Sequence, residues 1–187
     1  MDSMNAISED SALKFCELCN WVYESWVTHK IIFDKNKNPD ANIRKVAYFA
    51  QRLPDITQKY SLLQICKLHD PAIQGKSPNL TIDYIVRFGD WGEEEPRVTK
   101  IVQELSEFYK KLKPARDKIL AHNDYETHTL NTIQGVFPEG LDNKYFKTLQ
   151  ELVKAVSEKW LSNPIYPFND LADAEEFLEL LNRSPKF

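Results

Sequence analysis

The stretch "RVTKIVQELSEFYKKL", residues 97–112, shows most clearly how this chain folds. Its large apolar side chains recur every three or four residues, at Ile101, Leu105, Phe108 and Leu112, and therefore share one face of a helix. The chain has only five glycines, and the alternation of Val, Ile and Thr that is typical of strands is scarce. The sequence thus predicts an all-α protein.

The same helical period runs through most of the chain and is interrupted by turn-forming residues. We expect a bundle of five to seven helices in a single domain that spans residues 1–187. Pro54 marks a kink or a break within residues 41–69, Thr81 suits the cap of a short helix 82–88, and Asp142 is the expected cap of a helix 142–161. The other predicted helices are 8–33, one beginning near residue 97, and a short one within 169–183. Residues 69–79 contain Pro, Gly and Asn and are expected to form a loop.

Composition limits the classes of function. With a net charge of −4 and a pI of about 5.6, the chain does not have the basic surface of a nonspecific nucleic-acid binder. A small basic pocket is still compatible, and the densest positive cluster is "YKKLKPARDK", residues 109–118. No apolar run approaches the roughly 20 residues of a membrane span, and the acidic N-terminus is unlike a signal peptide. Because three cysteines also suit a reducing compartment, we expect a cytoplasmic protein without membrane contact.

The cysteines raise the question of a structural metal. Cys16 and Cys19 form a C-x-x-C, and Cys66 and His69 form a C-x-x-H, so the ligand types of a zinc site are present. Both pairs lie in helical apolar segments, however, where a spacing of three residues places core side chains on one face. Ordinary buried thiols are therefore the preferred interpretation, and we expect no metal.

A polar stretch, "KPARDKILAHNDYETH", residues 113–128, follows the apolar stripe. His122 continues that stripe, so a buried histidine with a hydrogen-bond partner is one interpretation. A reaction site is the other, because Arg116, Asp117 and Asn123 lie close by in the sequence. On an ideal helix Arg116 and His122 would point about 120° apart. Either the helix ends or distorts near His122, or a second copy of the chain completes the site.

Two stretches resemble a known family. "ARDKILAHND", residues 115–124, resembles the signature of the HEPN superfamily, an arginine followed by a polar residue and, after four to six residues, a histidine. "CKLHDPAIQGKSPNLTI", residues 66–82, resembles the phage abortive-infection branch of that superfamily. The resemblance implies a HEPN-like helical bundle that acts as a metal-independent endoribonuclease, serves as a toxin or defence effector, and works as a homodimer without a cofactor.

The residue types fit that chemistry. RNA is cut without a metal when its 2′-OH attacks the adjacent phosphate, which leaves a 2′,3′-cyclic phosphate and a 5′-OH. His122 would act as general base or acid, because histidine titrates near neutral pH. Arg116 would clamp the phosphate, and Asp117 or Asn123 would orient the pair. We expect Lys113 and Lys118 to add positive field at the rim of the RNA site.

One tyrosine departs from the family pattern. Some HEPN toxins carry a tyrosine two residues after the histidine, where AMP can be attached when a nucleotidyltransferase antitoxin is present. Tyr125 lies three residues after His122, so this regulation carries over only as a weaker expectation, together with a possible antitoxin partner.

Two other functions stay open at this point. The acidic pI favours a non-catalytic HEPN-type helical module that binds a nucleotide or a protein partner. A zinc-stabilised helical adaptor would rest on the cysteines alone. The Arg116–His122 pair favours the ribonuclease.

Overall fold

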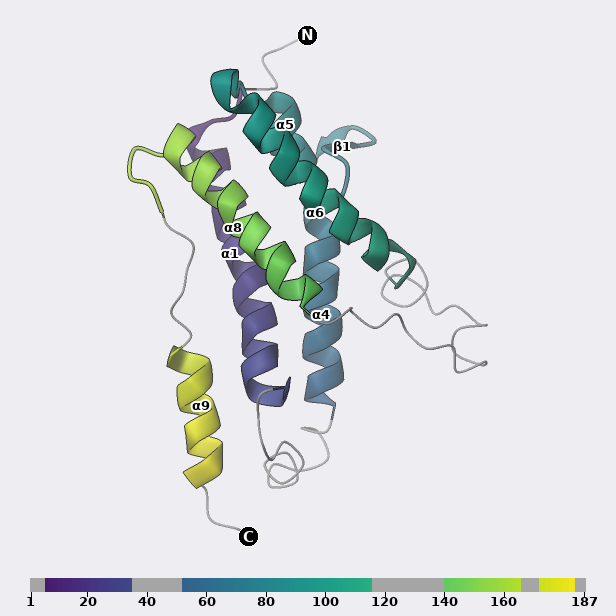
Figure 1. Ribbon diagram of the computed structural model, residues 1–187, viewed down its shortest axis with the longest axis vertical. Coiled ribbons are helices and arrows are strands. Elements are labelled where there is room, and N and C mark those ends of the chain that lie inside the picture. Colours follow the sequence, from purple (N-terminus) through teal and green to yellow (C-terminus); the bar gives the residue numbers. More distant parts are fainter. Residues whose placement is uncertain (1–5, 35–51, 116–139, 166–171, 184–187) are drawn as a thin grey trace.

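Three long helices pack side by side and form the centre of the bundle in the computed structural model (Figure 1). They are α1 (Glu9–His29), α6 (Glu95–Ala115) and α8 (Leu141–Trp160), and α8 packs against both of the others. A fourth helix, α4 (Leu53–Leu68), lies along α1. The structure describes residues 6–34, 52–115, 140–165 and 172–183.

Two short helices complete the set. The helix α5 (Ile82–Phe88) packs on α6, and α9 (Ala172–Arg183) lies beside η1 (Lys30–Asp34), a π-helical turn that extends α1. A 3-10 turn, η2 (Gly92–Glu94), leads into α6. The described residues thus contain six α-helices, and the predicted all-α bundle is confirmed.

Local sequence signals explain three of the helix starts. The N–H of Ser11 donates to the hydroxyl of Ser8 at 3.2 Å, and the N–H of Ser8 donates to the hydroxyl of Ser11 at 2.9 Å, so the two serines cap α1 reciprocally. Thr81 caps α5, as predicted, by accepting the N–H of Tyr84 at 3.3 Å. Pro54 lies in the first turn of α4, where its missing N–H costs nothing. The prediction of a kink or break at Pro54 is therefore resolved as a helix start, and residues 41–51 lie outside the described part.

Two local predictions were wrong. Asp142 is not the cap of α8, because Gly140 occupies that position with φ of +79°, a conformation that glycine adopts without strain. Asp142 lies two residues later, in the first turn of α8, and is buried. The expected loop 69–79 holds a minimal antiparallel pair, β1 (Ile73–Gln74) with β2 (Ser77–Pro78), which turns at Gly75 with φ of +65°. A pair this short leaves too little alternation for sequence reasoning to detect.

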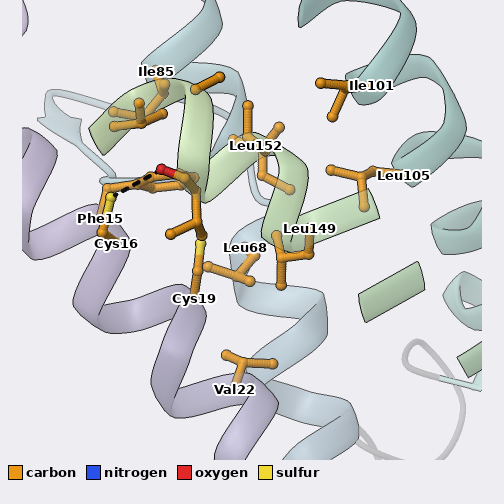
Figure 2. Close-up of a cluster of buried hydrophobic side chains, with 14 of the residues drawn as sticks. Phe15, Cys16, Cys19, Val22, Leu68, Ile85, Ile101, Leu105, Leu149 and Leu152 are labelled. Carbon is orange, nitrogen blue, oxygen red and sulfur yellow. Dashed lines mark hydrogen bonds between the residues drawn. The ribbon is translucent and has the colours of Figure 1, made fainter. Parts of the chain in front are cut away.

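The core forms where the apolar faces of the helices meet. Figure 2 shows side chains of α1 meeting those of α4, α5, α6 and α8, among them Phe15, Leu68, Ile85, Leu105 and Leu149. The predicted stripe of residues 97–112 is buried here in full. Each fully buried side chain of this size contributes about 1.5–3 kcal/mol of hydrophobic stabilisation.

The cysteines belong to this core. All three cysteines are buried and none of them forms a disulfide, which confirms the preferred interpretation of the two cysteine pairs. The thiol of Cys16 donates to the carbonyl of Val153 at 3.8 Å (Figure 2). Burial, with a smaller contribution from Glu17, raises the pKa of Cys16 to about 12, so this thiol stays protonated and unreactive at neutral pH.

Candidate functional site

The polar motif follows directly on α6 in the sequence, and the described chain resumes at the start of α8. Lys113 is exposed in the last turn of α6. The other predicted site residues lie outside the described residues: Arg116, Asp117, Lys118, His122, Asn123 and Tyr125. Their expected roles stay predictions, and the described part of the site consists of the two helices that flank them.

An ion pair between the partly buried Lys30 and the buried Asp142 anchors the start of α8. The carboxylate of Asp142 accepts from the ammonium of Lys30 at 2.5 Å and from the indole N–H of Trp26 at 3.2 Å. Burial alone would raise the pKa of Asp142, but the hydrogen bonds from Lys30, the Asn143 N–H and Trp26 outweigh it and leave this pKa lowered. The end of α1 therefore holds the point at which the chain returns from the motif.

A groove of about 240 Å³ separates the C-terminal half of α6 from the N-terminal half of α8. Its α6 wall consists of Glu104, Glu107, Phe108 and Lys111, and its α8 wall consists of Leu141, Lys144, Tyr145 and Thr148. The two helices run antiparallel (Figure 1), so the end of α6, which leads into the motif, and the start of α8 lie at the same end of the groove. Lys111 and Lys144 consequently lie at the motif end of the groove, and Glu104 and Thr148 lie at the far end.

Most of the charged side chains of this groove have no ion-pair partner among the residues that the structure describes. Glu107 is paired with Lys110 at 2.5 Å. Lys111 and Lys144 are exposed, Glu104 is half-buried, and none of these three forms an ion pair with a residue of the described part. The groove thus presents positive charge next to the motif and a carboxylate at its other end.

Phe108 and Tyr145 are the aromatic lining of the groove, and Tyr145 contacts a histidine, His69, that lies outside this lining. The imidazole Nε2 of His69 and the hydroxyl of Tyr145 are 3.0 Å apart, and the His69 ring stacks on Tyr109 with centroids 4.4 Å apart. Tyr145 also stacks on Phe108. Burial lowers the pKa of His69 to about 4 and raises that of Tyr145 well above its usual value, so both side chains are neutral at pH 7. His69, one of the candidate zinc ligands, is thus held beside this lining by Tyr145 and Tyr109.

A second hollow, of about 330 Å³, lies between α1 and α4. Aromatic and aliphatic side chains line most of it, including Trp21, Phe33, Tyr60 and Phe177. His29 contributes to the wall, and its Nδ1 lies 2.9 Å from the hydroxyl of Thr57. Because that hydroxyl donates to the carbonyl of Leu53 at 2.8 Å, it accepts from His29 Nδ1–H.

Neither hollow offers a cluster of metal ligands. Across the described ranges, no three His, Cys, Asp or Glu side chains gather closely enough to hold a metal ion. The chemistry available at the α6–α8 groove is instead that of lysine, carboxylate and hydroxyl groups above an aromatic floor.

Comparison with known families fits this arrangement of helices. The model of a HEPN family, AbiU2, matches residues 7–177, which include the four helices of the bundle, the groove and the motif. The chain belongs to the AbiU2 family of HEPN domains. The superfamily and the abortive-infection branch, both inferred from short motifs, are thereby confirmed for this HEPN domain.

The other comparisons add no relative. No curated protein and no solved structure matches the chain. Among the helices that the structure describes, none is long and apolar enough to cross a membrane.

Sequence reasoning missed part of the groove of this HEPN domain. Lys111 belongs to the positive cluster of residues 109–118, but no sequence motif indicates a role for Lys144 or Glu104. Lys144 sits in an ordinary amphipathic helix far along the chain, and Glu104 reads as a solvated charge. Only the packing of α8 on α6 brings them to one groove.

Proposed function

We propose that this HEPN domain is a metal-independent endoribonuclease that acts as a toxin or phage-defence effector. The observation that carries the proposal is the Arg116–Asp117–x4–His122 sequence in a chain of the AbiU2 family. The exposed Lys111, Lys113 and Lys144 on the flanking helices support it, because they offer positive charge to an RNA strand near the motif.

The proposed reaction is an in-line transesterification. A base, His122, takes the proton of the 2′-OH, whose oxygen then attacks the adjacent phosphorus. The bond from phosphorus to the 5′ oxygen breaks, and an acid protonates that oxygen as it leaves. Arg116 stabilises the charge on the phosphorane oxygens, and Asp117 or Asn123 orients the two side chains. The products are a 2′,3′-cyclic phosphate and a 5′-OH, and no cofactor takes part.

The proposed active form is a homodimer. Each copy brings one motif histidine, whereas the reaction uses one group to remove a proton and another to deliver one. A two-fold axis near the motif would supply both, because it repeats each residue on the other side of the axis. Lys113 and Lys118 of both copies would line the rim of the shared cleft.

A second candidate is the non-catalytic module that binds a nucleotide or a protein, such as an antitoxin. The net charge of −4 favours it, because this charge opposes strong RNA binding outside a local basic site. In that case the groove would still bind a ligand but RNA would stay intact.

Purified protein and its variants separate these candidates. We expect His122→Ala and Arg116→Ala each to lower RNA cleavage by about 10²–10⁴-fold, because each removes a group that acts in the transition state. His128→Ala, a histidine of the same stretch outside the motif, is the matched control and should cleave normally. Cleavage should persist in EDTA and yield cyclic phosphate ends. Full activity of His122→Ala would overturn the proposal.

A further inference from the structure

The lining of the α6–α8 groove changes along its length from basic to aromatic to acidic, and this order suits one nucleotide. Lys111 and Lys144 offer four-carbon stems with ammonium groups at the motif end, where a phosphate would meet them. The middle of the floor is aromatic, with Phe108 and Tyr145 beneath it. The far end holds Glu104.

That far end presents only acceptors to a ligand. Glu104 is half-buried in α6 and makes no hydrogen bond to another residue of the described ranges. The hydroxyl of Thr148 donates to the carbonyl of Lys144 at 3.0 Å, so only its lone pairs are available to the groove. A ligand that reaches this end must therefore bring N–H or O–H donors.

We propose that this groove binds one nucleotide of a single-stranded RNA, with its phosphate at Lys111 and Lys144 and a guanine base at Glu104. The inference rests on the proposed ribonuclease function for its link to cleavage, because it places the recognised nucleotide beside the motif. Guanine presents an imino N–H and an amino group side by side on one edge, and a carboxylate accepts both at once. Uracil offers one such donor, and adenine and cytosine offer only the amino group on that edge.

The dimensions favour a single unpaired nucleotide. About 240 Å³ is below the range of roughly 300–1,000 Å³ typical of pockets for drug-sized ligands, so the groove suits one base with its phosphate at the rim. In a duplex the donor edge of guanine is engaged in pairing, whereas an unpaired base can turn that edge to the protein. Glu104 is thus a specificity-determining residue, and RNA should be cut beside guanines in loops or single strands.

Free nucleotides test the groove without any cleavage. In isothermal titration calorimetry with 5′-GMP, 5′-IMP and 5′-UMP, we expect GMP to bind about 10-fold more tightly than the other two, because inosine lacks the amino group and uracil has one donor. Glu104→Gln should remove this preference, since an amide offers one acceptor in place of two. The matched control Glu151→Gln, an exposed carboxylate of α8 outside the groove, should leave it unchanged.

The lysine end is tested with RNA. Binding of a guanine-containing pentanucleotide to the His122→Ala variant should weaken with salt. Adding Lys111→Gln and Lys144→Gln together should reduce the slope of log affinity against log salt by about 1.4, or roughly 0.7 for each lost phosphate contact. Lys154→Gln, another exposed lysine of α8, is the matched control. An unchanged slope in the double variant would contradict the phosphate assignment.

The two proposals fail in different ways. Equal affinity for GMP and UMP, or a preference that Glu104→Gln leaves intact, overturns the guanine site even if RNA is cut in a His122-dependent manner. RNA that stays intact while GMP binds through Glu104 overturns the ribonuclease and leaves the guanine site standing. Cleavage sites mapped by sequencing should shift away from guanine in Glu104→Gln and should keep the wild-type preference for guanine in the control Glu151→Gln.

Discussion

The two hollows of this HEPN domain differ in how their polar groups are satisfied. In the α1–α4 hollow, the indole N–H of Trp21 donates to the hydroxyl of Tyr60 at 2.9 Å, and His29 donates to Thr57 at 2.9 Å. In the α6–α8 groove, Glu104, Lys111 and Lys144 have no such partner within the described part. Within the described residues, the larger hollow has one charged side chain without such a partner, Glu24, whereas the smaller one has three.

The difference teaches that volume alone is a poor guide to a binding site. Polar groups already bonded within the protein gain little from a ligand, whereas unpaired charged groups gain hydrogen bonds when a complementary ligand binds. The α6–α8 groove also lies between the end of α6, after which the polar motif begins, and the start of α8, where the described chain resumes. We therefore propose that ligand recognition takes place in the α6–α8 groove. Three pairs of matched variants compare the surroundings of this groove with those of the α1–α4 hollow.

The largest expected effect concerns two ion pairs, Lys30–Asp142 beside the α6–α8 groove and Lys59–Asp55 on α4. Asp142→Ala should lower the free energy of unfolding by about 3 kcal/mol, because it leaves Lys30 and the Trp26 indole without their buried acceptor beside the groove. Asp55→Ala breaks the exposed pair with Lys59 on α4 and should cost about 0.5 kcal/mol or less beyond any loss of helix-start charge. Urea denaturation measures both. Equal costs would show that the anchor of α8 is no stronger than a surface pair.

The next effect is a pH dependence, and it compares two histidines. His69, beneath the groove, has a pKa of about 4 in the folded state against an ordinary value of 6.5. Between these values the unfolded chain binds a proton that the folded chain does not, so stability falls as pH falls. The loss from this group should be about 2 kcal/mol between pH 7 and pH 5. His69→Gln should flatten that part of the curve.

His29, which lines the α1–α4 hollow, is the histidine with which His69 is compared. Burial lowers its pKa, and the nearby Asp34 opposes the shift. His29→Gln should therefore flatten the same part of the curve less than His69→Gln does. Denaturant titrations at pH 7, 6 and 5 check both variants, and a larger flattening in His29→Gln would reverse the comparison.

The smallest expected effect concerns two tyrosine hydroxyls. Tyr145→Phe should cost about 1 kcal/mol, because the half-buried His69 ring nitrogen loses its partner while the aromatic packing stays in place. Tyr60→Phe removes a hydroxyl at the exposed rim of the α1–α4 hollow, where water replaces it for Trp21. Its cost should be near zero in the same thermal or urea unfolding experiment. A loss of stability in Tyr60→Phe as large as in Tyr145→Phe would mean that the rim bond is as strong as the buried one.

The sequence predicted those features that depend on near neighbours in the chain. The stripe of residues 97–112, the buried cysteines and the Thr81 cap all follow from helical period or from the side chain of one residue, and all were confirmed. The short motif led to the right family. Asp142 was predicted wrongly because an acidic residue at a helix start looks the same whether it caps that helix or pairs with a lysine on another.

By itself, then, the sequence determined the helices, the apolar faces that form the core and the family. The tertiary structure decided what lies beside the motif: the inward pairing of Asp142 with Lys30, the aromatic side chains around His69, and the meeting of Glu104 and Lys111 with Lys144. The physical reason is the separation along the chain between the residues that determine each feature. Periodicity reports which face of a helix is apolar, but the partner of that face and the register between two helices depend on how side chains far apart in the chain pack together.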